Sequence, residues 1–220
     1  MSLTASPKII KGGLVVLDPD TGAVARTIPL QYNPDTLTRT YQVQGAGGDG
    51  ATERAQPFRL KAPAIESIKL EAEIDATDLL EHPEQNANAV RHGIAPQLAA
   101  LEGLVNPTTR ELRAQEAESR SGTLEILPPA PPLVLFVWSA SRVVPVRITE
   151  FTIAEEAFDA ALNPIRAKVS LGLRVMSTDD LGFEGQGGSI FINHLRSREA
   201  LAAKGAAVSL QALGLGRLPG

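Results

Sequence analysis

The sequence contains no cysteine, which excludes disulfide bonds, thiol catalysis and cysteine-ligated metal sites. Aromatic residues make up only 4% of the chain, and this scarcity disfavours surfaces that recognise bases or sugars by stacking. No apolar run reaches the roughly 18 residues that a membrane-spanning helix needs. The N-terminal MSLTASPKIIKGG has no apolar stretch of signal-peptide length, so no secretion leader is expected.

Positive charge is also in short supply. The 25 acidic residues exceed the 21 lysines and arginines, and the net charge of −4 argues against a general nucleic-acid binder, which needs a positive field. Hydrophobic residues reach 43% of the 220 residues, enough for a proper core. The length suits one large domain or a domain with an appendage.

The strongest pattern in the chain lies between residues 132 and 175 and predicts three successive strands. Residues 133–138 are apolar throughout, as in a strand buried on both faces, and residues 142–153 are rich in β-branched side chains. Residues 166–175 alternate without a break, which is typical of a half-buried strand. Its apolar side carries Ala167, Val169, Leu171, Leu173 and Val175.

Four further strands are predicted nearer the N-terminus. Residues 8–18 and 23–31 form the first two, and residues 36–44 resume after the break at Asn33-Pro34-Asp35, so we expect a hairpin from 23–31 and 36–44. Residues 64–74 alternate between an apolar and a charged face, which places them on a sheet with one side open to water.

Helices are predicted at two places. Pro96 stands in the first turn of a helix whose apolar stripe runs through Ile94, Leu98 and Leu101, and Asn106-Pro107 ends it. A second helix is predicted over 190–204, with Ser189 as its N-cap and Gly205 at its end.

The remaining segments carry weaker signals. We expect residues 75–92 to be irregular, the highly charged residues 108–120 to form a loop rather than a solvated helix, residues 122–127 to form a short strand, and residues 178–188 to be a glycine-rich linker.

The motifs that suggest chemistry each have a plainer explanation. Residues 45–50, GAGGDG, fit G-x-G-x-x-G, but Pro57 leaves no room for the helix that a dinucleotide site requires. The carboxylate pairs lie in polar contexts typical of solvated surface, and the histidines are far apart. These residues are the pairs Asp75/Asp78, Glu155/Glu156 and Asp179/Asp180, and the histidines His82, His92 and His194. We therefore expect no catalytic, cofactor or metal site.

Basic side chains of the predicted three-strand core form the most suggestive polar group. They indicate either an ordinary solvated strand face or a surface for an acidic partner or a channel, and the residues alone favour neither. The group comprises Arg142, Arg147, Arg166, Lys168 and Arg174.

Residues 133–176, LVLFVWSASRVVPVRITEFTIAEEAFDAALNPIRAKVSLGLRVM, strongly resemble the tube-type proteins of contractile injection systems. These are the phage-tail-like particles of the Afp and Photorhabdus virulence cassette type, and the likeness is greatest to their baseplate tube-initiator or adaptor subunit. LQYNPDTLTRTYQ (30–42) is similar to the family's N-terminal F-N-P-x-T-L motif, HGIAPQLAALEGLVNP (92–107) to its proline-opened helix, and FINHLRSREALAA (191–203) to a C-terminal helix that many members carry.

The resemblance implies an α+β, mainly β, tail-tube-like fold: an antiparallel barrel or sandwich over residues 1–177 with a flanking helix, and a linker and helical extension over 178–220. It implies a homo-hexameric ring that joins a spike (VgrG-like) protein to an inner tube (Hcp-like) protein or a second initiator within the baseplate. Assembly in the cytoplasm into a particle that can be released would follow, without nucleic acid or membrane insertion. The five basic residues would then face the ring or its channel.

One departure from the family pattern concerns the C-terminus. Many adaptor subunits carry a LysM module there, and residues 205–220 are too short and too apolar for one, which puts peptidoglycan binding in doubt. Two other functions stay open. One is a LysM-free baseplate wedge or docking protein outside the channel, and the more remote one is a nucleotide-binding enzyme that uses the 45–50 loop.

Overall fold

The computed structural model describes residues 10–19, 21–45, 60–120 and 132–205, together with Gln211 and Arg217. Seven strands form one sheet in the order β2-β1-β5-β6-β7-β4-β3, and every neighbouring pair is antiparallel. The predicted α+β, mainly β, class is therefore confirmed. The strands are β1 (Gly13–Leu17), β2 (Val24–Pro29), β3 (Leu37–Gln42), β4 (Ile65–Asp75), β5 (Val134–Ser139), β6 (Arg142–Phe158) and β7 (Pro164–Val175).

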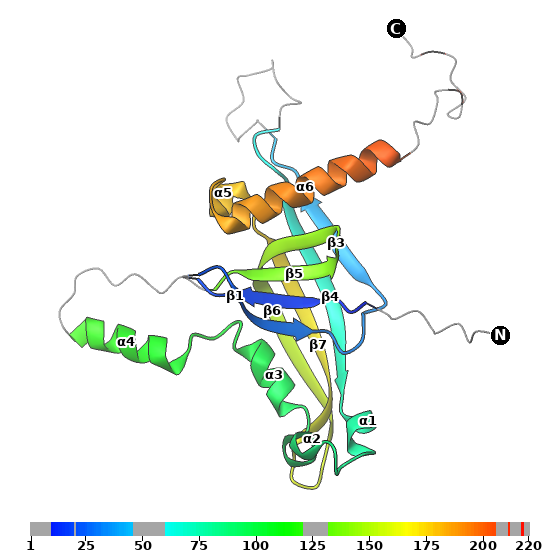
Figure 1. Cartoon of the computed structure of the whole chain (residues 1–220), viewed down its shortest axis with the longest axis vertical. Coiled ribbons are helices and arrows are strands. Elements are labelled where there is room, and N and C mark those ends of the chain that lie inside the picture. Colours follow the sequence, from blue (N-terminus) through cyan, green and yellow to red (C-terminus); the bar gives the residue numbers. More distant parts are fainter. Residues whose placement is uncertain are drawn as a thin grey trace.

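Six helices lie in the described part of the chain, and four of them are short or stand at the surface. The helices are α1 (Thr77–Leu80), α2 (Ala87–His92), α3 (Ala95–Glu102), α4 (Thr109–Arg120), α5 (Thr178–Leu181) and α6 (Gln186–Lys204). Figure 1 shows α6 across one end of the sheet, α1 and α2 at the opposite end near the β6–β7 turn, and α4 projecting away from the body.

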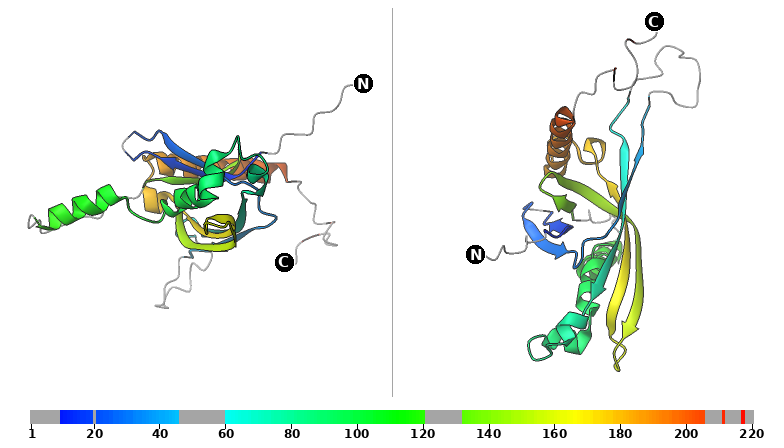
Figure 2. Two further views of the ribbon diagram at one scale, coloured as in Figure 1. Left: turned by 90° about the horizontal axis from the view of Figure 1, so that it is seen from below. Right: turned by 90° about the vertical axis from the view of Figure 1, so that its right-hand side faces the viewer.

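The sheet folds over itself. Its long strands β4, β6 and β7 run along the longest axis, while β1, β2 and β5 cross one face of them (Figures 1 and 2). We call the face turned toward β1, β2, β5 and α3 the inner face, and the opposite one the outer face. The inner face holds one continuous apolar core, which includes Leu14, Ile68, Leu98, Phe136, Val144 and Leu171.

Strand β7 has the predicted two-sided pattern. Ala167, Val169 and Leu173 on its inner face are 0% exposed, and the residues that alternate with this face, such as Lys168 and Ser170, point to the outer face. Burial of these side chains supplies the main stabilisation of the long strands, at about 1.5–3 kcal/mol for each large aliphatic group.

Strand β6 is longer than predicted. It continues through 17 residues to Phe158 and turns through residues 159–163, whereas the sequence suggested an end near residue 153. The Asp159 carboxylate closes this turn because it accepts hydrogen bonds from the backbone N–H groups of Ala161 and Asn163. Leu162 adopts a left-handed conformation there, with φ of 64°.

The hairpin predicted from residues 23–31 and 36–44 is wrong. Strand β2 pairs with β1 and β3 pairs with β4, so β2 and β3 lie at opposite edges of the sheet. The connection between them is held by distant partners: the Asn33 side chain accepts from the Gly12 N–H, and the Gln31 side chain both donates to and accepts from the Asp75 backbone. Because of these contacts, residues 30–36 run from one edge of the sheet to the other instead of forming a tight turn.

Three helix predictions need correction. Residues 108–120 were expected to be a loop, yet α4 forms because Thr108 and Glu111 make a reciprocal capping box, and the residues that follow are good helix formers. The second predicted helix begins at Gln186 with Gly185 as its N-cap, so Ser189 lies inside it. Residues 75–92 contain the short helices α1 and α2 rather than irregular chain alone.

The helix at Pro96 is present as α3, which packs Leu98 and Leu101 into the core. Within the described residues, no helix has the length and apolar character needed to cross a membrane. The strand predicted over 122–127 lies outside the described residues.

Candidate functional site

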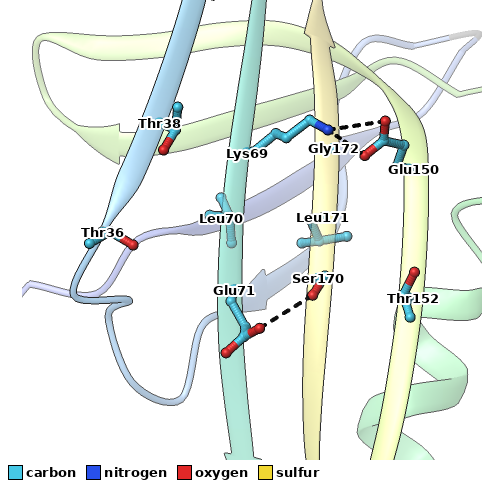
Figure 3. A pocket seen from close by; sticks show the side chains of 10 residues that line it. All are labelled: Thr36, Thr38, Lys69, Leu70, Glu71, Glu150, Thr152, Ser170, Leu171 and Gly172. Carbon is cyan, nitrogen blue, oxygen red and sulfur yellow. Dashed lines mark hydrogen bonds and ion pairs between the residues drawn. The ribbon is translucent and has the colours of Figure 1, made fainter.

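The outer face of β3, β4, β6 and β7 is the largest polar surface that the strands build. Its side chains alternate with the core residues, and in the part of the chain that the structure describes no helix lies over it (Figure 2). A shallow hollow of about 280 Å³ lies in its middle, lined mainly by threonines, Lys69, Glu71, Glu150 and Ser170 (Figure 3).

An ion pair crosses this hollow. The Lys69 Nζ on β4 lies 2.8 Å from the Glu150 Oε2 on β6, although β7 runs between these two strands. Gly172 is the β7 residue paired with both. A Cβ at this position would come within 2.8 Å of the Glu150 Cβ, so only glycine leaves room for the two side chains to meet.

Four of the five predicted basic residues lie on the outer face, and three of them face carboxylates. Arg166 lies 3.5 Å from Asp75, Lys168 lies 3.3 Å from Glu156, and Arg174 lies 2.9 Å from Asp180. Arg147 is paired in register with Arg174 on β7. The outer face is thus a network of opposite charges, not the basic surface that the sequence suggested.

Arg142 lies on the other side of the sheet from the remaining four. It shares the strand parity of buried Val144 and Val146, and its charged neighbours are Arg39, Glu66 and Arg198. Burial lowers the pKa of the Arg142 guanidinium below its usual value, and the positive charge of Arg39 lowers it further. The structure therefore separates Arg142 from the group to which sequence reasoning assigned it.

A buried carboxylate organises this second site. Glu66 is only 5% exposed although it is ionisable, because β4 turns it to the inner face beneath α6. Its two oxygens lie 2.6 Å from the Arg39 Nε of β3 and 3.5 Å from the Arg198 Nη1 of α6. The Tyr41 ring stacks under both guanidiniums, each 5.2 Å from its centroid. These contacts fasten α6 to the edge strand β3.

His194 of α6 lies close to the same group. It is 5% exposed, and among the described residues only the backbone of Ser141 approaches the ring, without the geometry of a good hydrogen bond. Burial lowers the pKa of the imidazole below its usual value, against the opposing effect of Glu66, so the ring is neutral near pH 7. Sequence reasoning missed this cluster, although Glu66 on the apolar side of an alternating strand was a visible signal.

The other candidate residues do not assemble into a catalytic arrangement. Asp75 accepts from the Thr77 hydroxyl and backbone, and that side-chain hydrogen bond is the main cause of its lowered pKa. Asp180 caps α5, while His82 and His92 are exposed on separate segments at the far end of the sheet. Among the described residues no three acidic or histidine side chains gather in a way that could hold a metal ion.

The glycine motif of residues 45–50 lies almost wholly outside the described residues. Its flanking strands β3 and β4 are antiparallel neighbours. A dinucleotide site needs parallel strands joined by a helix, so this topology argues against the nucleotide-binding alternative.

The sheet and its short helices together correspond to a known family. Residues 15–183 match the family model described as the contractile injection system tube protein. The chain belongs to this family. No curated protein matches the sequence. In this tube protein the matched region begins within β1 and covers β2 to β7 and α1 to α5, while α6 follows it.

Proposed function

We propose that this tube protein is a structural, non-enzymatic subunit of a homo-hexameric ring at the baseplate of a contractile injection system. The ring connects the spike protein to the inner tube protein or to a second initiator layer. The family match over residues 15–183 supports membership of such a particle. The ring, its six copies, its neighbours and its cytoplasmic assembly are parts of the proposal.

The observation that carries the proposal is the outer face. Four adjacent strands present a polar surface whose lysines and arginines largely face carboxylates on other strands of the same surface. A channel wall has to stay wetted without binding the charged molecules that pass along it, and a surface of alternating, paired charges meets both needs. We therefore assign the outer face to the channel.

The edges of the same four strands favour a ring. Strand β3 ends the sheet on one side, and on the other side β5 pairs with β6 only as far as Val146. Among the described residues, the later part of β6 has a partner on its β7 side alone. Unpaired edges of this kind are completed by neighbouring chains. Two different edges on one protomer give a head-to-tail contact, the kind that forms a ring when the rotation between copies closes.

The test uses the absence of native cysteine, which makes an introduced thiol unique. Ser170→Cys places a thiol on the exposed outer face, and Ser119→Cys places a control thiol on the projecting helix α4. In the assembled particle, Ser170→Cys should react with a small maleimide but not with a large poly(ethylene glycol) maleimide. Ser119→Cys should discriminate less between the reagents.

Two results would contradict the proposal. Native mass measurement that finds only monomers, even with spike and tube proteins present, would remove the ring. Equal reaction of Ser170→Cys with both reagents in the particle would place the outer face outside the channel, as expected for a wedge or docking protein.

A further inference from the structure

Groups of opposite charge lie along α6. Its N-terminal end adjoins α5, and Asp179 of α5 and Glu184 of the connection to α6 are exposed and form no ion pair with described residues. Toward its C-terminal end lies the basic cluster, which we define as Arg39, Arg142 and Arg198. The helix has 19 residues, so at 1.5 Å per residue it is about 28 Å long and spans the width of the protomer (Figure 1).

The basic cluster has one carboxylate for three guanidiniums. Glu66 serves Arg39 and Arg198, and within the described residues Arg142 has neither an ion pair nor a hydrogen bond. Burial, Arg39 and Arg198 lower the pKa of the Arg142 guanidinium, and Glu66 only partly opposes them. The negative charge near Arg142 is therefore too small to balance the positive charges. A partly buried, unpaired guanidinium is costly, and a carboxylate from another chain would neutralise it.

A groove opens near this cluster, although none of the three arginines lines it. It has a volume of about 210 Å³ and lies between the β5–β6 turn at Ala140 and Ser141 and the side of α6 that carries Ile190, Asn193 and Ser197. His194, a neighbour of Arg39 and Arg198, lines it with its imidazole. Because that ring is neutral, it adds no charge to the cluster but offers one nitrogen donor and one acceptor.

The acidic end carries a matching apolar group. Phe183 is 71% exposed and stands between Asp179 and Glu184 in the sequence. Asp180, by contrast, forms an ion pair with Arg174 and takes part in the capping box of α5. Exposed aromatic side chains are enriched in protein interfaces, and carboxylates at the rim of an interface favour a basic partner surface.

We propose that the acidic end of one protomer docks on the basic cluster of the next copy in the ring, with Arg142 receiving the carboxylate of Asp179 or Glu184. Phe183 then covers the groove beside His194. This inference rests on the proposed ring and names its lateral contact. The partner is a second copy because one chain carries both complementary surfaces: the acidic group precedes the N-terminus of α6, and the basic cluster lies beside the second half of the same helix. Such a contact is head-to-tail, as ring closure requires.

Charge reversal tests the contact. Arg142→Glu should raise the concentration needed for ring formation by at least about tenfold, since it places a like charge opposite the acidic end. Arg91→Glu in α2 is the matched control, because Arg91 is exposed at the opposite end of the molecule. Asp179→Arg/Glu184→Arg changes only exposed residues and should impair assembly equally. Combining it with Arg142→Glu should restore rings.

The outcomes separate this inference from the proposed function. Rings that form equally well with Arg142→Glu and Arg91→Glu would overturn the inference and leave the ring intact. Loss of rings with Arg142→Glu alone, when the Asp179→Arg/Glu184→Arg protein assembles normally, would also overturn it, because both halves of the contact must matter. An unaltered chain that never forms rings would overturn the proposed function itself. Native mass measurement and electron microscopy distinguish these cases.

Discussion

Lys69 and Glu150 form an ion pair with 2.8 Å between the Lys69 Nζ and the Glu150 Oε2, although a whole strand of the sheet separates their backbones. The pair is possible because Gly172 of the intervening strand has no side chain. The absence of a side chain at Gly172 on β7 therefore permits an ion pair between β4 and β6 on the outer face.

Gly172→Ala should lower the free energy of unfolding by about 1–3 kcal/mol, the usual cost of forcing an extra methyl group into a packed site. The new Cβ would lie 2.8 Å from the Glu150 Cβ and would push Glu150 away from Lys69. Urea unfolding measures the change. Ser170→Ala, one outer-face position away on the same strand, should shift stability by no more than about 0.5 kcal/mol. Equal effects of the two variants would contradict the packing argument.

Glu66→Gln should lower stability by about 1–3 kcal/mol, because among the described residues it removes the one carboxylate that pairs with Arg39 and Arg198. The cost is below that of a fully buried pair, since both arginines are partly exposed to solvent. Glu71→Gln on the outer face of the same strand is the control and should have little effect. Thermal and urea unfolding compare the two, and a neutral Glu66→Gln variant would show that α6 does not depend on this contact.

Stability should fall as the pH is lowered below about 6.5, with His194 as the cause. Its folded-state pKa lies below the ordinary 6.5, so the unfolded chain binds more protons in the interval between the two values. The stabilisation is present above that interval and is lost as the pH falls through it. Glu66 and the Ser141 backbone oppose the effect, while Arg39 and Arg198 reinforce it.

His194→Leu should flatten this pH dependence, whereas His92→Gln, at an exposed position, should leave it unchanged. Urea unfolding at several pH values between 5 and 8 supplies the comparison. An identical slope in the unaltered protein and His194→Leu would show that another group titrates.

Thr108→Ala should loosen α4 without affecting the rest of the fold. The Thr108 hydroxyl accepts from the Glu111 N–H, and loss of such a cap costs a helix about 1 kcal/mol. Since α4 buries none of its residues, the cost should appear as faster amide hydrogen exchange over residues 109–120, with global unfolding unchanged. Thr109→Ala lies inside the helix and should slow exchange slightly, because alanine favours helix.

Local periodicity predicted the long strands well. The alternation of residues 166–175 and 64–74 assigned the faces of β7 and β4 because side-chain direction in a strand depends only on parity. The same rule places Arg142 and Arg147 on opposite faces, so grouping them on one surface overlooked a signal that was present. Glu66 likewise stood on the apolar face in the sequence, and its burial followed from that position.

Nonlocal contacts explain what the sequence did not predict. Strands β2 and β3 separate to opposite edges because Gln31 and Asn33 bond to Asp75, Gly12 and Ile10, none of them a near neighbour in the chain. The charge network of the outer face depends on register between strands, which alternation within one strand does not contain. Helix α4 was predicted as a loop for a different reason: the high charge of residues 108–120 was given more weight than the capping pattern of Thr108 and Glu111.

Strand β6 has a mechanical consequence. One strand of 17 residues pairs with β5 over Arg142–Val146 and with β7 from Val146 to Phe158, and so runs from the end of the sheet near α6 to the turn at Leu162. A force along the long axis would load the hydrogen bonds of β6, β7 and β4 together in shear, instead of peeling them apart one at a time. The protomer should be stiff in the direction of its strands and yield first where its short strands cross them.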